Sequence, residues 1–195
     1  MTTQAGTIRV LGISGSLRAA STNTKLLYVA AGLVSSGVVG TGVRLELWHD
    51  LGLVPPFNED DEHVPPQPVR ALRTAISDAD ALLIATPEYN SSIPGQLKNA
   101  VDWASRPYGQ GVLRAKPVAV VGASVSAYGA ARAQAELRKA LTTAGAQVLD
   151  RELQVARAHE AFGPEGQLQD PELRNGLRDI LADLERTVRP VPKVA

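Results

Sequence analysis

The loop from Ser14 to Thr24 carries the kinds of groups that bind an anion. Its polar side chains are hydroxyls, one carboxamide and one guanidinium: those of Ser14, Ser16, Ser21, Asn23 and Arg18. Apolar residues at helical spacing follow the loop, so we expect these groups at a helix N-terminus, where unpaired N–H groups and the helix dipole favour a phosphate. The loop matches neither the dinucleotide fingerprint nor the Walker A sequence. A capped turn with Arg18 in solvent would explain the same residues, so the loop alone leaves both interpretations open.

Two further polar segments follow apolar runs later in the chain. Pro87 to Ser92 comes after the run 81–85, and Ser124 to Gly129 comes after the run 118–121. In open α/β sheets, ligands bind beyond the carboxyl ends of the strands. If the three strands are neighbours in the sheet, the three loops converge on one crevice.

The elements that position these loops alternate between strands and helices. Apolar patterns predict strands over 7–13, 43–47, 81–85, 118–121 and 147–149. Helical spacing predicts helices with apolar faces that include Leu26, Leu72, Leu97, Leu137 and Leu177. Thr22 or Asn23 is expected to cap the first helix, and Asp170 with Pro171 to begin the last. This alternation predicts an α/β fold, in which a five-stranded parallel sheet is covered by helices on both faces.

Length and composition set limits on the function. The 195 residues are expected to form one domain over 1–189, followed by a loose tail over 190–195. Lys and Arg total 20, as do Asp and Glu, so no basic excess favours a nucleic acid or an anionic membrane. No segment approaches the roughly 18 apolar residues that a membrane span needs, and no targeting segment precedes the first strand, which favours a cytoplasmic location. Cysteine is absent, so redox chemistry would need a cofactor.

Other polar residues are better explained by structural roles. The acidic run 59–62 with His63 is expected to be a solvated loop, because its carboxylates are adjacent and no second cluster accompanies them. His49 and His159 are isolated, so we expect no metal site. Glu88 could act as a general base, but a structural hydrogen bond is the favoured interpretation of this residue.

Several segments together resemble the NADPH-dependent FMN reductase family, and this resemblance covers most of the chain. The most specific run is Pro87-Glu88-Tyr89-Asn90-Ser91-Ser92-Ile93-Pro94-Gly95-Gln96-Leu97-Lys98-Asn99-Ala100-Val101-Asp102-Trp103, and Gly15-Ser16-Leu17-Arg18 with Ser21 and Asn23 supports it. The family has a flavodoxin-like fold, a three-layer sandwich. It includes enzymes described as chromate, quinone and azo-dye reductases.

The resemblance implies roles for residues in all three loops. The phosphate of FMN would be held by Ser14, Ser16, Arg18, Ser21 and Asn23, with the backbone N–H groups of Leu17 and Thr24 nearby. The edge of the isoalloxazine ring would lie along Pro87, Glu88, Tyr89, Asn90 and Ser91, where backbone N–H groups can stabilise the reduced anionic flavin. Ser124 and the loop to Gly129 would close the third side. Directly after this third loop, Ala130 occupies a position at which relatives often have glycine.

The resemblance also implies an activity. The chain would be an NAD(P)H-dependent oxidoreductase with non-covalent FMN, passing a hydride from NADPH or NADH to FMN and then to a small acceptor. The acceptor would be a quinone, a free flavin, an azo compound or a metal oxyanion, and no side chain would be a catalytic acid, base or nucleophile. An FMN-binding electron carrier for a protein partner is the alternative, although such carriers tend to be strongly acidic and this chain is neutral.

The family forms dimers and tetramers, so the resemblance implies a homodimer or a homotetramer here. Candidate contacts are the aromatic segments around Pro56-Phe57 and Trp103 to Tyr108. Trp103 and Leu97 are expected in the core or an interface. Arg106 could contact a substrate, a neighbouring subunit or a salt-bridge partner. Tyr89 could stack on a planar ligand or pack at a subunit contact.

Overall fold

The computed structural model describes residues 6–39 and 42–189. The expected tail over 190–195 lies outside the described residues. The strands are β1 (Ile8–Ser14), β2 (Val43–Trp48), β3 (Ala81–Thr86), β4 (Pro117–Ala123), β5 (Gln147–Val148) and β6 (Leu153–Val155). The α-helices are α1 (Thr22–Ser35), α2 (Gln67–Asp78), α3 (Gly95–Ala104), α4 (Ala131–Thr143) and α5 (Pro171–Val188), and two short 3-10 helices, η1 (Asp50–Leu53) and η2 (Glu59–Asp61), follow β2.

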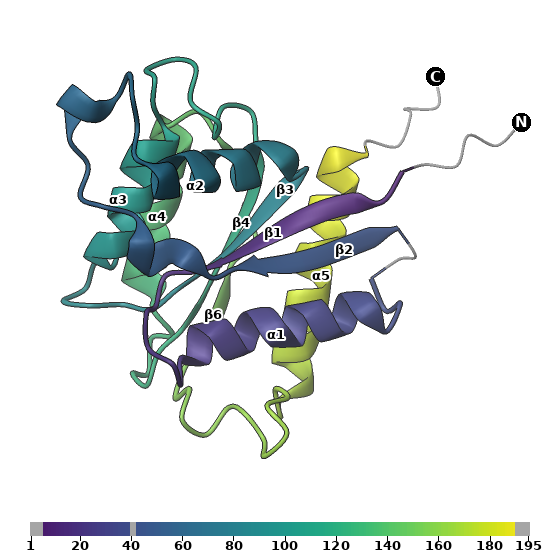
Figure 1. Cartoon of the computed structure of the whole chain (residues 1–195). Coiled ribbons are helices and arrows are strands. Elements are labelled where there is room, and N and C mark those ends of the chain that lie inside the picture. Colours follow the sequence, from purple (N-terminus) through teal and green to yellow (C-terminus); the bar gives the residue numbers. More distant parts are fainter. Residues whose placement is uncertain (1–5, 40–41, 190–195) are drawn as a thin grey trace, which may run out of the picture.

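All the strands are parallel and lie in the order β2-β1-β3-β4-β5, with β6 also paired to β4. Helices α1 and α5 cover one face of this sheet, and α2, α3 and α4 cover the other (Figure 1). The predicted parallel sheet between two helical layers is therefore confirmed. Because β1, β3 and β4 are neighbours, the loops that follow them leave the same edge of the sheet.

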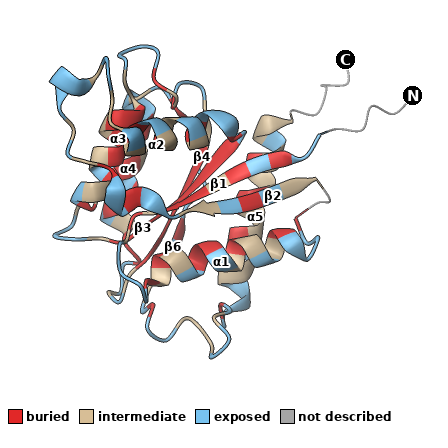
Figure 2. Ribbon diagram, in the orientation of Figure 1, coloured by how far each residue is buried: buried red, intermediate tan, exposed pale blue. Residues whose placement is uncertain are grey.

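Every residue of β3 is buried, and its side chains alternate between two cores. Leu83 packs with α1 and α5, whereas Leu82 and Ile84 pack with α2, α3 and α4. Figure 2 shows the same burial along the central strands. A strand covered on both faces can be apolar at every position, which is why β3 was recognisable as a continuous run.

The side of the sheet beyond β4 differs from the prediction of one strand over 147–149. The sheet there contains two short pieces, β5 beside Pro117–Val118 and β6 beside Val121–Ala123. Leu149 still donates its N–H to the carbonyl of Val118 at 2.8 Å, and Arg138 of α4 donates a hydrogen bond to the carbonyl of Leu149, so the chain leaves the sheet after this residue and returns at β6. The charged residues between the two pieces interrupt the apolar pattern, so β6 gave too short a signal to predict.

A second difference concerns the start of α1. The N-cap is Ser21, whose Oγ accepts the N–H of Thr24 at 3.2 Å, and not Thr22 or Asn23 as predicted. Serine satisfies one of the free N–H groups of the first turn as well as asparagine does, and a one-residue shift is within the precision of boundary prediction. The last helix begins as predicted, since Asp170 caps it and Pro171 is its first residue.

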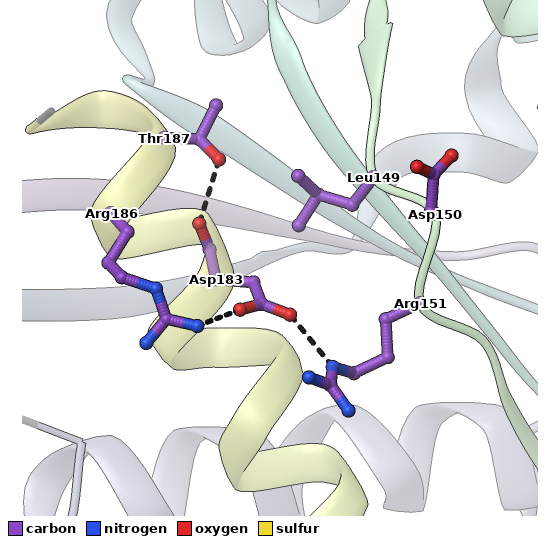
Figure 3. Close-up of a pocket in the computed structure, with 6 residues that line it drawn as sticks. All are labelled: Leu149, Asp150, Arg151, Asp183, Arg186 and Thr187. Atoms are coloured by element: carbon purple, nitrogen blue, oxygen red, sulfur yellow. Dashed lines mark hydrogen bonds and ion pairs between the residues drawn. The ribbon is translucent and has the colours of Figure 1, made fainter.

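A surface ion-pair cluster joins α5 to the segment between β5 and β6. Asp183 lies between Arg151 and Arg186, as Figure 3 shows, with Arg151 Nε 2.7 Å from Asp183 Oδ2. Thr187 Oγ1 also donates to the backbone carbonyl of Asp183 at 2.8 Å. The hydrogen bond from Arg151, helped by the charge of both arginines, lowers the pKa of Asp183 below its ordinary value of 3.8.

This lowered pKa makes a pH-dependent contribution to stability. The ionised carboxylate stabilises the folded chain above the unfolded pKa, and the contribution disappears as the pH falls through the lower folded pKa. Asp183→Asn is expected to lower the free energy of unfolding by about 0.5–1 kcal/mol at pH 7, since the pair is near the surface, and by less at pH 3. Urea unfolding at both pH values measures the difference. An equal loss for Asp183→Asn at both pH values would contradict the prediction.

Candidate functional site

The first and second loops pack directly against each other at the carboxyl edge of the sheet. The N–H of Gly15 donates to the carbonyl of Ala85 at 2.8 Å. A Cβ atom on Gly15 would lie 2.7 Å from Leu97 Cδ2 and 3.4 Å from Pro87 Cδ, so glycine permits this close approach. The predicted convergence of the loops is therefore confirmed for these two.

Hydroxyl groups hold the first loop in its conformation. Thr24 Oγ1 donates to Ser14 Oγ at 2.8 Å, which joins the end of β1 to the first turn of α1. Ser14 Oγ accepts the N–H of Ser16, and Ser16 Oγ accepts the N–H of Arg18, each at 3.4 Å. The N–H of Thr24, predicted to lie near the phosphate, is already bonded to the capping Ser21.

Other donors of the first loop remain available to a ligand. Within residues 6–39 and 42–189, no hydrogen bond occupies the N–H groups of Leu17, Thr22 and Asn23. The Arg18 side chain is exposed, and it has no ion pair with any residue that the structure describes. Free N–H groups at the start of α1, together with a free guanidinium, fit a phosphate group.

Asn23 has a different place from the one predicted. Its side chain is only 2% exposed, and its Nδ2 donates to the carbonyl of Ala123 while its Oδ1 accepts the N–H of the same residue, both at 2.9 Å. The amide thus points into the fold and joins α1 to the end of β4. Its contacts do not support a role of this amide in holding a phosphate, whereas the backbone N–H of Asn23 is free.

The second loop contains a tight turn. Tyr89 and Ser92 exchange backbone hydrogen bonds of 3.2 and 3.0 Å, and the two central residues, Asn90 and Ser91, have φ values of 52° and 62°. Positive φ at both central positions defines a type I′ turn. No hydrogen bond with a described residue occupies the N–H groups of Asn90 and Ser91. The turn therefore presents two donors, at the position where the resemblance puts the edge of the flavin ring.

The third loop is held against β6. The N–H of Ser124 donates to the carbonyl of Val155 at 3.0 Å, and Ser124 Oγ bonds to Ser126. Gly129 has a φ of +54°, and Ala130 has a φ of 62°. The left-handed region favours glycine, so Ala130 adopts a backbone conformation that is unusual for an alanine.

Gly129 also approaches the backbone of β6. A Cβ atom there would lie 2.7 Å from the carbonyl carbon of Gln154. Gly129→Ala is therefore expected to lower the free energy of unfolding by about 2 kcal/mol, from the left-handed φ and the contact together. Thermal unfolding measures the loss, and Gly166→Ala, which shares the positive φ but has open space around it, is the control. An equal effect of the two substitutions would contradict the contribution of the backbone contact.

Other residues singled out in the sequence make contacts within the fold. Trp103 and Leu97 are fully buried in the core, as expected. Arg106 lies over the ring of Phe57 and is 3.9 Å from Glu62 of the acidic run. Within residues 6–39 and 42–189, no three acidic, histidine or cysteine side chains are grouped so that they could hold a metal ion.

The polar face of α3 has a role that sequence reasoning missed. Gln96 Nε2 donates to the carbonyls of Leu51 and Val54 at 2.8 and 2.7 Å. Asn99 and Trp103 bind the carbonyl of Pro55 at 2.8 and 2.9 Å. These side chains hold the proline-rich loop after β2, and their spacing on one face of the helix is the signal that could have revealed it.

Exposed apolar side chains lie on the segments that follow the strands at this edge of the sheet. One or two follow each of β1, β2, β3 and β4, and all are about half exposed or more: Leu17, Leu53, Tyr89, Val125 and Tyr128. Grouped exposed apolar residues mark binding surfaces in proteins. The edge of the sheet thus combines polar donors for an anion with an apolar rim.

Comparison with known proteins agrees with this geometry. The family model described as NADPH-dependent FMN reductase matches residues 8–160. An NAD(P)H-dependent FMN reductase of Pseudomonas aeruginosa is 44% identical over 184 residues, which cover 93% of this chain and 96% of that protein. A 2-hydroxy-1,4-benzoquinone reductase of a Burkholderia species is 45% identical over 131 residues, 67% of this chain and 68% of that protein.

A solved structure shows the same architecture. The flavoenzyme FerB of Paracoccus denitrificans, an NAD(P)H:(acceptor) oxidoreductase, superimposes with a TM-score of 0.79 at 35% identity, over 93% of this chain and 97% of that chain. The parallel sheet, the free donors at its carboxyl edge and these similarities lead to one assignment. The chain belongs to the NADPH-dependent FMN reductase family.

Proposed function

We propose that this chain binds FMN between the loops at the carboxyl edge of the sheet and uses it to carry electrons from NAD(P)H to a small-molecule acceptor. The observation that carries the proposal is the pair of donor sets at one edge of the sheet. Free N–H groups and Arg18 at the start of α1 suit the phosphate, and the free N–H groups of Asn90 and Ser91 suit the ring edge. The relatives are named as reductases, so the alternative of an electron carrier for a protein partner is not supported.

In this proposal backbone N–H groups and polar side chains of the three loops bind and orient the cofactor. Ser14, Ser16, Leu17, Arg18, Ser21 and Thr24 form the phosphate loop, with Asn23 contributing its backbone N–H. Pro87, Glu88, Tyr89, Asn90 and Ser91 form the ring-edge loop, and Ser124 and Gly129 belong to the third side. Bound FMN supplies the redox chemistry, so no side chain needs to act as an acid or a base.

A quinone is the acceptor class that we favour. Two kinds of observation support it: the apolar rim, which suits a flat apolar molecule, and the relatives named as quinone reductases from Burkholderia and from plants. Purified protein should be yellow, and should oxidise NADPH or NADH in the presence of 1,4-benzoquinone. A colourless protein that takes up no added FMN and oxidises neither nucleotide would overturn the proposed function.

We also propose that the chain forms a homodimer or a homotetramer. Trp103, which the sequence offered as a subunit contact, is fully buried within the chain and therefore cannot touch a partner subunit. Tyr108, at the other end of the same segment, is 88% exposed and is available for such a contact. Light scattering after size-exclusion chromatography gives the mass of the assembly. A monomer at micromolar concentration would contradict this part of the proposal.

The single domain over 1–189 and the cytoplasmic location are proposals too. Both core clusters draw on residues from across the described chain, which supports one folding unit. Among the described helices, none is long and apolar enough to cross a membrane. One cooperative unfolding transition, and recovery of the protein with the cytoplasmic fraction of its cells, are the expected results.

A further inference from the structure

Helix α4 begins without a side-chain cap of its own. Its N-cap residue is Ala130, which has no polar side chain to accept the first N–H groups of the helix. Glu88, from the loop after β3, supplies the acceptor instead. Its Oε2 accepts the N–H of Arg132 at 3.0 Å and the N–H of Ala133 at 3.3 Å. The cap of α4 thus comes from a residue 44 positions earlier in the chain.

Two further hydrogen bonds connect the same loop to the same helix. Arg132 Nη1 donates to Ser91 Oγ at 2.8 Å, and Ser92 Oγ donates to Glu136 Oε2 at 2.5 Å. Three side chains of the loop therefore contact the first two turns of α4. The carboxylate of Glu88 also lies at the positive end of the helix dipole, where its negative charge is favoured.

The type I′ turn from Tyr89 to Ser92 lies among these contacts, and the residues of the turn do not favour this turn type. Type I′ turns prefer glycine at the second central position, and serine in the left-handed region costs about 1 kcal/mol. Pro87 is buried on the β3 side of the turn, and the bonds to α4 hold its other side. Contacts outside the turn therefore decide where the free N–H groups of Asn90 and Ser91 point.

We propose that Glu88 is a positioning residue for the flavin, acting through the turn that it fixes to α4. This inference rests on the proposed function, because it assumes that the turn lies along the ring of FMN. The Glu88 side chain caps the helix and does not exchange protons with substrate. Both hydrogen bonds at its Oε2 are donated by backbone N–H groups, which agrees with the structural interpretation of this residue. By holding the two free N–H groups in place, Glu88 sets how well the turn stabilises the reduced, anionic flavin.

Two substitutions separate the geometry of Glu88 from its charge. Glu88→Gln keeps a carbonyl oxygen that can accept both N–H groups, whereas Glu88→Ala removes the acceptor. Asp170→Ala is the matched control, since Asp170 caps α5 by accepting the N–H of Glu172 at 2.8 Å. Each alanine variant loses a helix cap, so both are expected to be less stable, and only their effects on bound FMN distinguish them.

The expected effects are measured on the FMN-free protein and on the loaded protein. In Glu88→Ala without FMN, hydrogen exchange at the N–H groups of Arg132 and Ala133 becomes about tenfold faster, as the loss of a cap predicts. The dissociation constant for FMN, measured by quenching of flavin fluorescence, rises about tenfold. The midpoint potential of bound FMN becomes more negative, because the reduced form is stabilised less. Glu88→Gln recovers most of each effect, and Asp170→Ala leaves the affinity and the potential unchanged.

The outcomes distinguish this inference from the proposed function. If the unmodified protein binds FMN and Glu88→Ala has the same affinity and potential, the positioning role is overturned while the proposed function stands. If Glu88→Ala does not fold, Ser92→Ala tests the same connection through Glu136, and an unchanged midpoint potential in that variant overturns the role. If the unmodified protein binds no FMN, both proposals are overturned.

Discussion

Substitution of Arg18 by alanine is expected to weaken the binding of FMN about 30-fold, because hydrogen bonds to charged groups contribute roughly 2 kcal/mol. The exposed guanidinium is not engaged by a carboxylate within the described residues, so no existing ion pair must be broken when it meets a phosphate. The loss should appear as release of FMN, whereas turnover with saturating FMN stays near that of the unmodified enzyme. Fluorescence titration gives the affinity, and steady-state NADPH oxidation at increasing FMN gives the turnover.

Arg44→Ala is the matched control for the loss of a positive charge. Arg44 is exposed on β2 and pairs with Glu46, on the strand itself and not in a loop at the carboxyl edge. This control should keep the affinity of the unmodified protein. If Arg18→Ala also keeps it, or loses turnover at saturating FMN, the role of Arg18 as a phosphate anchor is wrong.

Substitution of Asn23 by alanine is expected to lower the free energy of unfolding by about 3 kcal/mol. The change leaves the buried N–H of Ala123 without its acceptor and opens a space between α1 and β4. Part of the FMN affinity should be lost as well, because the start of α1 is no longer fixed to the sheet. Urea unfolding monitored by circular dichroism measures the stability, and the intrinsic fluorescence of the buried Trp103 reports the same transition.

An exposed asparagine provides the comparison for Asn23. Asn58 is exposed and caps the short helix η2 by accepting the N–H of Asp60 at 3.2 Å. Asn58→Ala should lower the stability by about 1 kcal/mol or less, since water replaces the lost contact. Equal losses at the two positions would show that the long-range bond of Asn23 does not contribute as its burial suggests.

The two predictions treat residues that looked alike in the sequence. Arg18 and Asn23 were both assigned to the phosphate, from the same polar loop before the same helix. The sheet brings the end of β4 next to the start of α1, and the amide of Asn23 is used there. Arg18 has no such neighbour among the described residues, so its charge is available to a ligand.

Strong local patterns predicted most of the fold. The buried run of β3 and the helical spacing of α2 and α5 follow from which side chains avoid water, and that preference is visible in the order of the residues. The division of this strand into β5 and β6 was not predicted, because segments of two and three residues are too short to show a periodic pattern of apolar side chains. The start of α1 was missed by one residue, because several neighbouring polar residues can each act as a cap.

The sequence by itself determined that a loop rich in hydroxyl, amide and guanidinium groups, from Ser14 to Thr24, lies between the first strand and the first helix. Only the tertiary structure decided which of its groups are free. Thr24 and Asn23 are engaged inside the fold, the latter with a residue 100 positions away, whereas Arg18 remains exposed. A hydrogen bond between distant segments depends on how the sheet brings them together, and no local pattern records that. The same reason hid the contact of Glu88 with α4, which spans 44 positions.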